Sequence, residues 1–161
     1  MIKKIEKGND ILSYSNIGSD VMIEYHPSLT DRQNLKIRRA VLKLPIQTIN
    51  TSINYEVDYI SIHNSIEESI VIDTFNNASA NNYVCIDISD EIQNLFNSNE
   101  NLLKIKIKNA NGNISFSGTL ELVIDLYSKK QKLNNSNYEF DCKHGGTGLI
   151  NLSTGTLQYV H

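Results

Sequence analysis

Residues that could carry out catalysis are few and are spread along the chain. The four histidines fall among predicted loops and strand ends: His26, His63, His144 and His161. Cys142 precedes His144 by two positions, so both would share one face of a strand, but no obvious third group orients the histidine as a base. Glu67 and Glu68 fall in a predicted turn, where we expect solvated carboxylates and no acid–base pair.

Signature motifs of common enzymes are absent from the sequence. It contains no Gly-x-Ser-x-Gly elbow, no His-Glu-x-x-His pair, no P-loop and no dinucleotide-binding fingerprint. The sequence therefore predicts a protein that is not an enzyme.

Metal-binding patterns are equally sparse. Cys142-x-His144 lacks the second ligand pair of a zinc site. Asp10, Asp20 and Glu24 could hold a structural calcium ion, but no loop has the ligand spacing of an EF-hand. We expect no cofactor, and leave structural calcium open.

The two cysteines, Cys85 and Cys142, are too few for a disulfide framework. Alternation in Tyr-Val-Cys-Ile-Asp-Ile places Cys85 on one face with Tyr83 and Asp87. We expect Cys85 to be a reduced thiol in a half-buried strand.

Composition is that of one globular unit. The chain has 161 residues, 40% hydrophobic content and a net charge of −3, which gives no basic footprint for nucleic acid. The sequence contains no run of about 18 apolar residues, the length that a membrane-spanning helix needs. Gly8-Asn9-Asp10 interrupts the position of a signal-peptide core, so we expect the protein to be made in the cytoplasm.

Most of the chain alternates strand patterns with turns rich in Asn, Ser and Gly. The expected strands are 19–25, 35–44, 55–63, 69–74, 83–88, 102–108, 113–117 and 120–127. Asn111-Gly112 predicts a hairpin between two of them. Ser89 is the expected N-cap of one short helix with an apolar stripe through Ile92, Leu95 and Phe96. The predicted fold is an all-β, antiparallel, jelly-roll-like sandwich with one short helix and a C-terminal β-hairpin.

Three segments resemble DNRLRE-type β-sandwich domains of bacterial surface proteins, which are similar to carbohydrate-binding modules. They are Arg39–Pro45, with its Leu–Pro ending, Val84–Ser89, which enters the helix, and Ile114–Gly118, with a Phe-Ser element. The likeness covers roughly residues 10–127. The family's frequent tryptophans are missing, so the resemblance does not carry over a ligand site built on them.

The C-terminal segment, residues 128–161, is predicted as a linker and hairpin that follow a sandwich domain of residues 1–127. Its Gly-Thr-Gly, Asn-Leu and Thr-Gly elements resemble the segment that follows such sandwiches in wall-associated and Rhs-like proteins. We expect it to be a docking or oligomerising arm, through Gly145, Gly146, Gly148, Asn151 and Gly155. Tyr138 and Tyr159 are the expected exposed rings for stacking on a ligand.

Two functions fit these patterns. The first is a phage virion accessory protein, a capsid decoration or tail-associated protein, that docks to a protein partner and acts without catalysis. The second is a carbohydrate- or wall-binding module of a larger bacterial surface protein. The first predicts location in the virion, the second on the cell surface, and either is compatible with a homo-oligomer.

Overall fold

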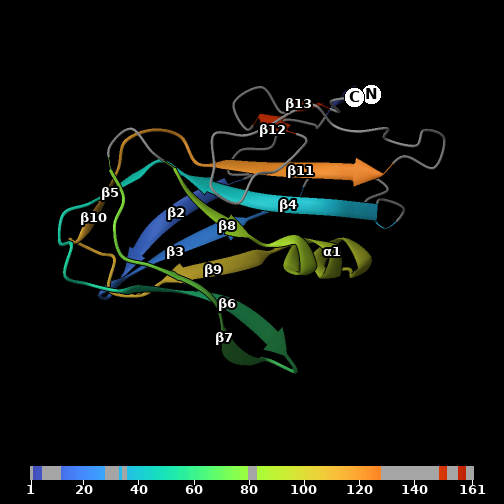
Figure 1. Cartoon of the computed structure of the whole chain (residues 1–161). Helices are drawn as coiled ribbons and strands as arrows, with labels where there is room; N and C mark the ends of the chain where they lie inside the picture. Colours follow the sequence, from blue (N-terminus) through green and yellow to red (C-terminus); the bar gives the residue numbers. More distant parts are fainter. Residues whose placement is uncertain are drawn as a thin grey trace.

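The alternating segment Leu103–Ile107 is the middle strand, β9, of a five-stranded antiparallel sheet in the computed structural model (Figure 1). Leu103, Ile105 and Ile107 are buried while Lys104 and Lys106 lie on the opposite face, because successive side chains of a strand alternate. The structure describes residues 2–4, 12–27, 33, 36–79, 83–127, 149–151 and 156–158.

The five-stranded sheet has the order β2-β3-β9-β6-β7, so β9 joins strands that are distant in sequence. Its other strands are β2 (Leu12–Ile17), β3 (Asp20–Tyr25), β6 (Tyr55–His63) and β7 (Ile66–Phe75). A β-bulge shifts the β6–β7 register between Val57 and Asp58. Both outer strands, β2 and β7, are sheet edges.

A second sheet, of six strands, has the order β1-β13-β12-β11-β4-β8. Its strands are β1 (Ile2–Lys4), β4 (Lys36–Leu44), β8 (Val84–Asp87), β11 (Glu121–Tyr127), β12 (Leu149–Asn151) and β13 (Thr156–Gln158). The C-terminal strands therefore extend the sheet that contains β11 and β4, within the same chain. A separate two-stranded ribbon pairs β5 (Ile46–Thr48) with β10 (Ile114–Phe116).

One hydrophobic core fills the space between the two large sheets. Its buried residues come from strands of both sheets and include Ala40, Leu42, Leu44, Leu122, Ile124, Val21, Ile23, Tyr25, Tyr55, Val57, Ile105 and Ile107. The antiparallel pairing and this shared core confirm the predicted all-β sandwich.

Helix α1 (Ser89–Asn97) packs on β4 and β9 through Ile92, Leu95 and Phe96, as the apolar stripe predicted. The predicted N-cap is wrong: Ile88 is the cap residue, without a side-chain hydrogen bond. The Ser89 hydroxyl instead accepts the Ala40 N–H at 2.9 Å, which ties the helix to β4. In the described part of the chain, no helix is long and apolar enough to cross a membrane.

The Asn111-Gly112 segment forms a turn but not the predicted hairpin. Gly112 has a φ of +81°, as such a turn requires. However, β9 is already paired on both sides, by β3 and β6, so β10 crosses to β5. The Asn111 side chain donates to the Gly18 carbonyl at 2.7 Å and so fastens the turn to the β2–β3 connection.

Candidate functional site

The open side of the sandwich lies between two edge strands, β7 of the five-stranded sheet and β8 of the six-stranded sheet. An edge strand presents backbone N–H and C=O groups that its own sheet does not pair. Hollows adjoin β7 near both of its ends, and their chemistry differs.

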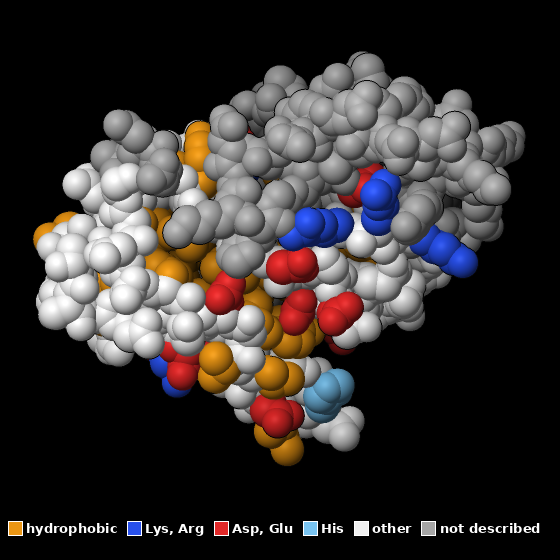
Figure 2. Space-filling view, viewed as in Figure 1, with side chains coloured by type: hydrophobic (Ala, Val, Ile, Leu, Met, Phe, Trp, Pro, Cys, Tyr) orange, Lys and Arg blue, Asp and Glu red, His pale blue; other side chains and the backbone are white. Residues whose placement is uncertain are grey.

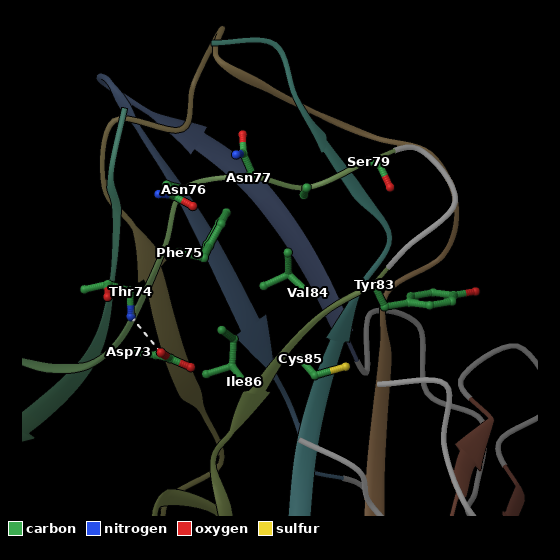
Figure 3. A pocket seen from close by; sticks show the side chains of 11 residues that line it. Asp73, Thr74, Phe75, Asn76, Asn77, Ser79, Tyr83, Val84, Cys85 and Ile86 are labelled. Atoms are coloured by element: carbon green, nitrogen blue, oxygen red, sulfur yellow. Dashed lines mark hydrogen bonds between the residues drawn. The ribbon is translucent and has the colours of Figure 1, made fainter. Parts of the chain in front are cut away.

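The first hollow, which we call the β7–β8 hollow, lies where β7 ends beside β8 and has a volume of about 300 Å³ (Figure 3). The side chains of Val84 and Ile86 point across it toward Phe75 and Asp73, whereas Tyr83 points away. Its polar lining consists of Asp73, Thr74, Asn76, Asn77 and Ser79.

Hydrogen bonds fix the segment that bounds this hollow. The Thr48 N–H donates to the Ala78 carbonyl at 3.1 Å, and the Ala78 N–H donates to Thr48 Oγ1 at 3.2 Å. Phe75 stacks on the fully buried ring of Tyr55, with centroids 5.2 Å apart. The β7–β8 hollow therefore has a well-anchored frame.

Aromatic rings near the surface are already engaged by other side chains. Lys43 Nζ lies 4.1 Å from the centroid of the Tyr83 ring, a cation–π distance. Tyr14 stacks on Phe116, with centroids 4.1 Å apart. A sugar stacks on a free ring face, so these contacts leave each of the two tyrosines at most one face for it.

Cys85 of β8 corrects the sequence prediction of a reduced thiol. It is buried and disulfide-bonded. The only other cysteine in the sequence is Cys142, which lies outside the described residues. Two cysteines far apart in a sequence show no recognisable framework, so the pattern gave no sign of the bond.

The second hollow, which we call the hairpin cleft, separates the β6–β7 hairpin from α1 and the loop that follows it. Its volume is about 450 Å³. Tyr59, Ser61 and His63 line it from β6, Leu95 from α1, and Glu100 from the loop.

Carboxylates make the hairpin cleft electronegative. Burial raises the pKa of Tyr59, and the charges of Glu91 and Glu100 raise this pKa further. Burial also raises the pKa of Glu91, with added repulsion from Asp90 and Asp87. Figure 2 shows acidic side chains gathered over α1 and toward the hairpin.

The hairpin itself exposes hydrophobic side chains. Half of the eight exposed large hydrophobic residues in the described chain lie on it: Ile62 (45% exposed), Ile66 (70%), Ile70 (44%) and Val71 (55%). Asn64 and Ser65, with φ of 51° and 66°, form its turn. Ile66 and Ile70 lie on one face of the hairpin and Ile62 and Val71 on the other. Exposed apolar side chains gathered on a strand pair are typical of an interaction surface.

The outer face of the five-stranded sheet carries paired charges. Asp58 is fully buried, and its carboxylate lies 3.5 Å from Lys108 Nζ, which lies 2.8 Å from Glu56. Burial and the adjacent Glu56 raise the pKa of Asp58, while hydrogen bonding by Lys108 and Asp58 lowers the pKa of Glu56. Lys108, which directly follows β9, thus neutralises carboxylates on the neighbouring strand β6.

Most of the predicted site residues lie outside the described residues: Tyr138, Tyr159, Gly145, Gly146, Gly148 and Gly155. Asn151 ends β12 and is paired with Thr156 of β13, so the C-terminal hairpin forms. Its role as a docking arm stays a prediction. Sequence reasoning missed the hairpin cleft, whose lining comes from β6, β7, α1, β9 and the loop after α1. Of its lining residues, only His63 had been considered for catalysis.

The structure gives the predicted metal candidates other partners. Asp20 accepts the Asn109 N–H at 3.0 Å, and Glu24 lies 3.5 Å from His26. Asp10, Cys142 and His144 fall outside the described residues. Within the described residues, no group of three or more His, Cys, Asp and Glu side chains could hold a metal ion.

The described site is therefore an edge strand with a fixed polar hollow near one end and an acidic, apolar-rimmed cleft near the other. Such an arrangement suits non-covalent binding. No protein-family model matches this chain, and no curated protein matches it.

Proposed function

We propose that the protein is a non-catalytic binding module that docks to a protein partner in a larger assembly. The observation that carries this proposal is the gathering of exposed hydrophobic residues on the β6–β7 hairpin, whose strand β7 is a sheet edge among the described strands. Apolar patches and open strand edges are costly to leave in water and are typical of surfaces that a partner covers. The assembly that we propose is a phage particle, in which the chain is a capsid decoration or tail-associated protein.

The first test is quantitative mass spectrometry of density-purified phage-like particles from the producing culture. Hundreds of copies per particle would support a decoration or tail-tube role, and a handful would support a baseplate or fibre role. Absence from particles, with the protein recovered on cell walls, would overturn the virion proposal.

A matched pair of variants links incorporation to the hairpin. Ile66→Ser and Ile70→Ser together should remove the protein from particles, because both side chains are exposed and serve no core. Ile49→Ser is the control, since Ile49 is 66% exposed but lies after β5, away from the hairpin. Equal incorporation of all variants would show that the hairpin is not the docking surface.

A carbohydrate- or wall-binding role is the second candidate, and the β7–β8 hollow favours it. Asp73, Asn76 and Asn77 offer hydrogen-bonding groups beside Phe75, a combination that sugar sites use. Asn77→Ala should then weaken retention on purified cell walls, whereas the hairpin variants should not. Wall retention that is the same for Asn77→Ala and the unmodified chain would contradict this candidate.

A further inference from the structure

The β7 edge and the hairpin cleft form one continuous surface, because Ile70 of β7 also lines the cleft. This surface refines the docking role proposed above, and the inference rests on that role. The backbone edge restricts the kind of partner that fits, and the cleft restricts the side chains that the partner can carry.

The backbone of β7 is suited to strand addition. It is ten residues long, pairs with β6 alone among the described strands, and is exposed along Ile66–Val71. An extended peptide laid along such an edge gains main-chain hydrogen bonds, while its alternate side chains meet the two faces of the sheet. The occupant is therefore an extended segment.

The charges of β7 select a basic occupant. Residues 66–75 include Glu67, Glu68 and Asp73 but no lysine or arginine. Lys104, a cation on the cleft lining, already lies 3.6 Å from Glu67. On the cleft side, Glu68 stands opposite Ser61 in the β6–β7 register, and Glu100 lines the cleft directly.

A second copy of β7 fits poorly. An antiparallel pairing centred between Ile70 and Val71 would place Glu68 of one strand opposite Asp73 of the other. Like charges directly opposite each other destabilise a strand pair. A heterologous segment with cations avoids this repulsion.

We infer that β7 receives an extended segment of another polypeptide in which lysine or arginine alternates with β-branched apolar residues, and that one cationic side chain enters the hairpin cleft. There the cation approaches Glu68 and Glu100 and lies beside the Tyr59 ring. The apolar residues of the segment lie on the opposite face of the sheet, where they cover Val71. Burial of these apolar side chains and neutralisation of the carboxylates both favour binding of the segment.

The test uses a fluorescein-labelled peptide that alternates lysine with valine, and a matched peptide that alternates glutamate with valine. Fluorescence anisotropy with the full chain measures affinity, and backbone amide NMR shifts locate the contact. We expect the lysine peptide to bind, with the largest shifts at residues 66–75, and to bind about tenfold more tightly than the glutamate peptide.

Variants separate the edge from the cleft. Val71→Lys blocks the edge with a charge, and its new side chain stands opposite Asp58, so the fold should be retained. Glu100→Gln removes one cleft charge and should weaken the lysine peptide while leaving the weak glutamate peptide unchanged. Ile49→Lys is the control with equal charge, and thermal unfolding checks every variant.

Each outcome decides the inference. Binding of the lysine peptide that is lost in Val71→Lys and kept in Ile49→Lys supports it. Equal binding of both peptides, no binding of either, or self-association that Val71→Lys abolishes would each overturn the stated partner. Incorporation into particles without peptide binding would leave the proposed function standing and this inference refuted.

Discussion

The two ends of β7 differ in how the molecule holds them. At the Phe75 end the strand runs into a segment that hydrogen bonds pin to Thr48, and Phe75 itself stacks on Tyr55. At the Ile66 end the same strand is exposed and, among the described strands, pairs only with β6. One end is stabilised by internal contacts, whereas the other is the end at which we propose that a partner docks. Exposure along β7 therefore falls from Ile66 towards Phe75, and we expect binding at the less anchored end.

Tyr55→Ala is expected to break the anchored end and to have the largest effect on stability. The ring is fully buried, stacks on Phe75, and its hydroxyl donates to the Asn50 carbonyl at 2.9 Å. Loss of a buried aromatic side chain costs about 3–5 kcal/mol in the free energy of unfolding. Urea unfolding followed by circular dichroism measures it. Tyr55→Phe, which keeps the ring, should cost clearly less, and equal costs would contradict the role given to stacking.

Thr48→Val is expected to loosen the same end more gently. The variant keeps the shape of the side chain but removes the hydroxyl that accepts the Ala78 N–H at 3.2 Å and donates to the Ala78 carbonyl at 3.3 Å. We expect a loss of about 1–2 kcal/mol in the free energy of unfolding, from these two hydrogen bonds. Hydrogen exchange should also accelerate at residues 76–79 and stay unchanged at the hairpin. Acceleration at both ends would mean that they are not independent.

Asp58→Asn tests the middle of β7, because Asp58 stands opposite Val71. Its pKa in the folded state is raised above 3.8 by burial and by Glu56, while Lys108 opposes the shift. A raised folded pKa means that Asp58 stabilises the fold below pH 3.8 and that this stability is lost as pH rises through the folded pKa. Glu56 has the opposite effect on the pH dependence of stability, because its pKa in the folded state is lowered.

The stability of Asp58→Asn relative to the unmodified chain should therefore increase as the pH rises from acid to neutral. Urea unfolding at a series of pH values measures this trend, with Asp90→Asn on the surface of the helix as the control. A difference that is flat across the series would show that Asp58 does not titrate as the buried geometry implies.

Ile66→Ser is expected to have the smallest effect on stability, within about 0.5 kcal/mol, because its side chain is 70% exposed. Its effect should appear only in docking. Thermal unfolding of the variant beside the particle assay separates the two quantities. A large loss of stability would show that the Ile66 end of β7 is anchored by internal contacts, as the Phe75 end is.

Local patterns predicted much of the fold. β6 has the predicted bounds, Tyr55–His63, and the alternation of β9 identified its buried isoleucines. β2 was not predicted, because Leu-Ser-Tyr-Ser-Asn-Ile is too polar for a typical strand pattern. Its pairing with β3 stabilises it as a strand. The start of β7 was missed because Glu67 and Glu68 resemble a turn.

The candidate site was the least predictable part. The cleft depends on the distance between Tyr59 and α1 residues more than thirty positions away, and periodicity within a segment carries no information about such distances. The disulfide at Cys85 was hidden for the same reason.

The central place of β9 has a consequence for biosynthesis. β3 and β6 cannot close their sheet until residues 103–107 have left the ribosome and inserted between them. Until then the isoleucines and valines of β3 and β6 stay exposed to water. A holdase chaperone would bind the nascent chain during this interval. Sheets joined by contacts this distant in sequence also fold slowly, typically in about milliseconds to seconds. A nascent chain stalled before Leu103 should therefore stay protease-sensitive, and one released beyond Tyr127 should acquire resistance.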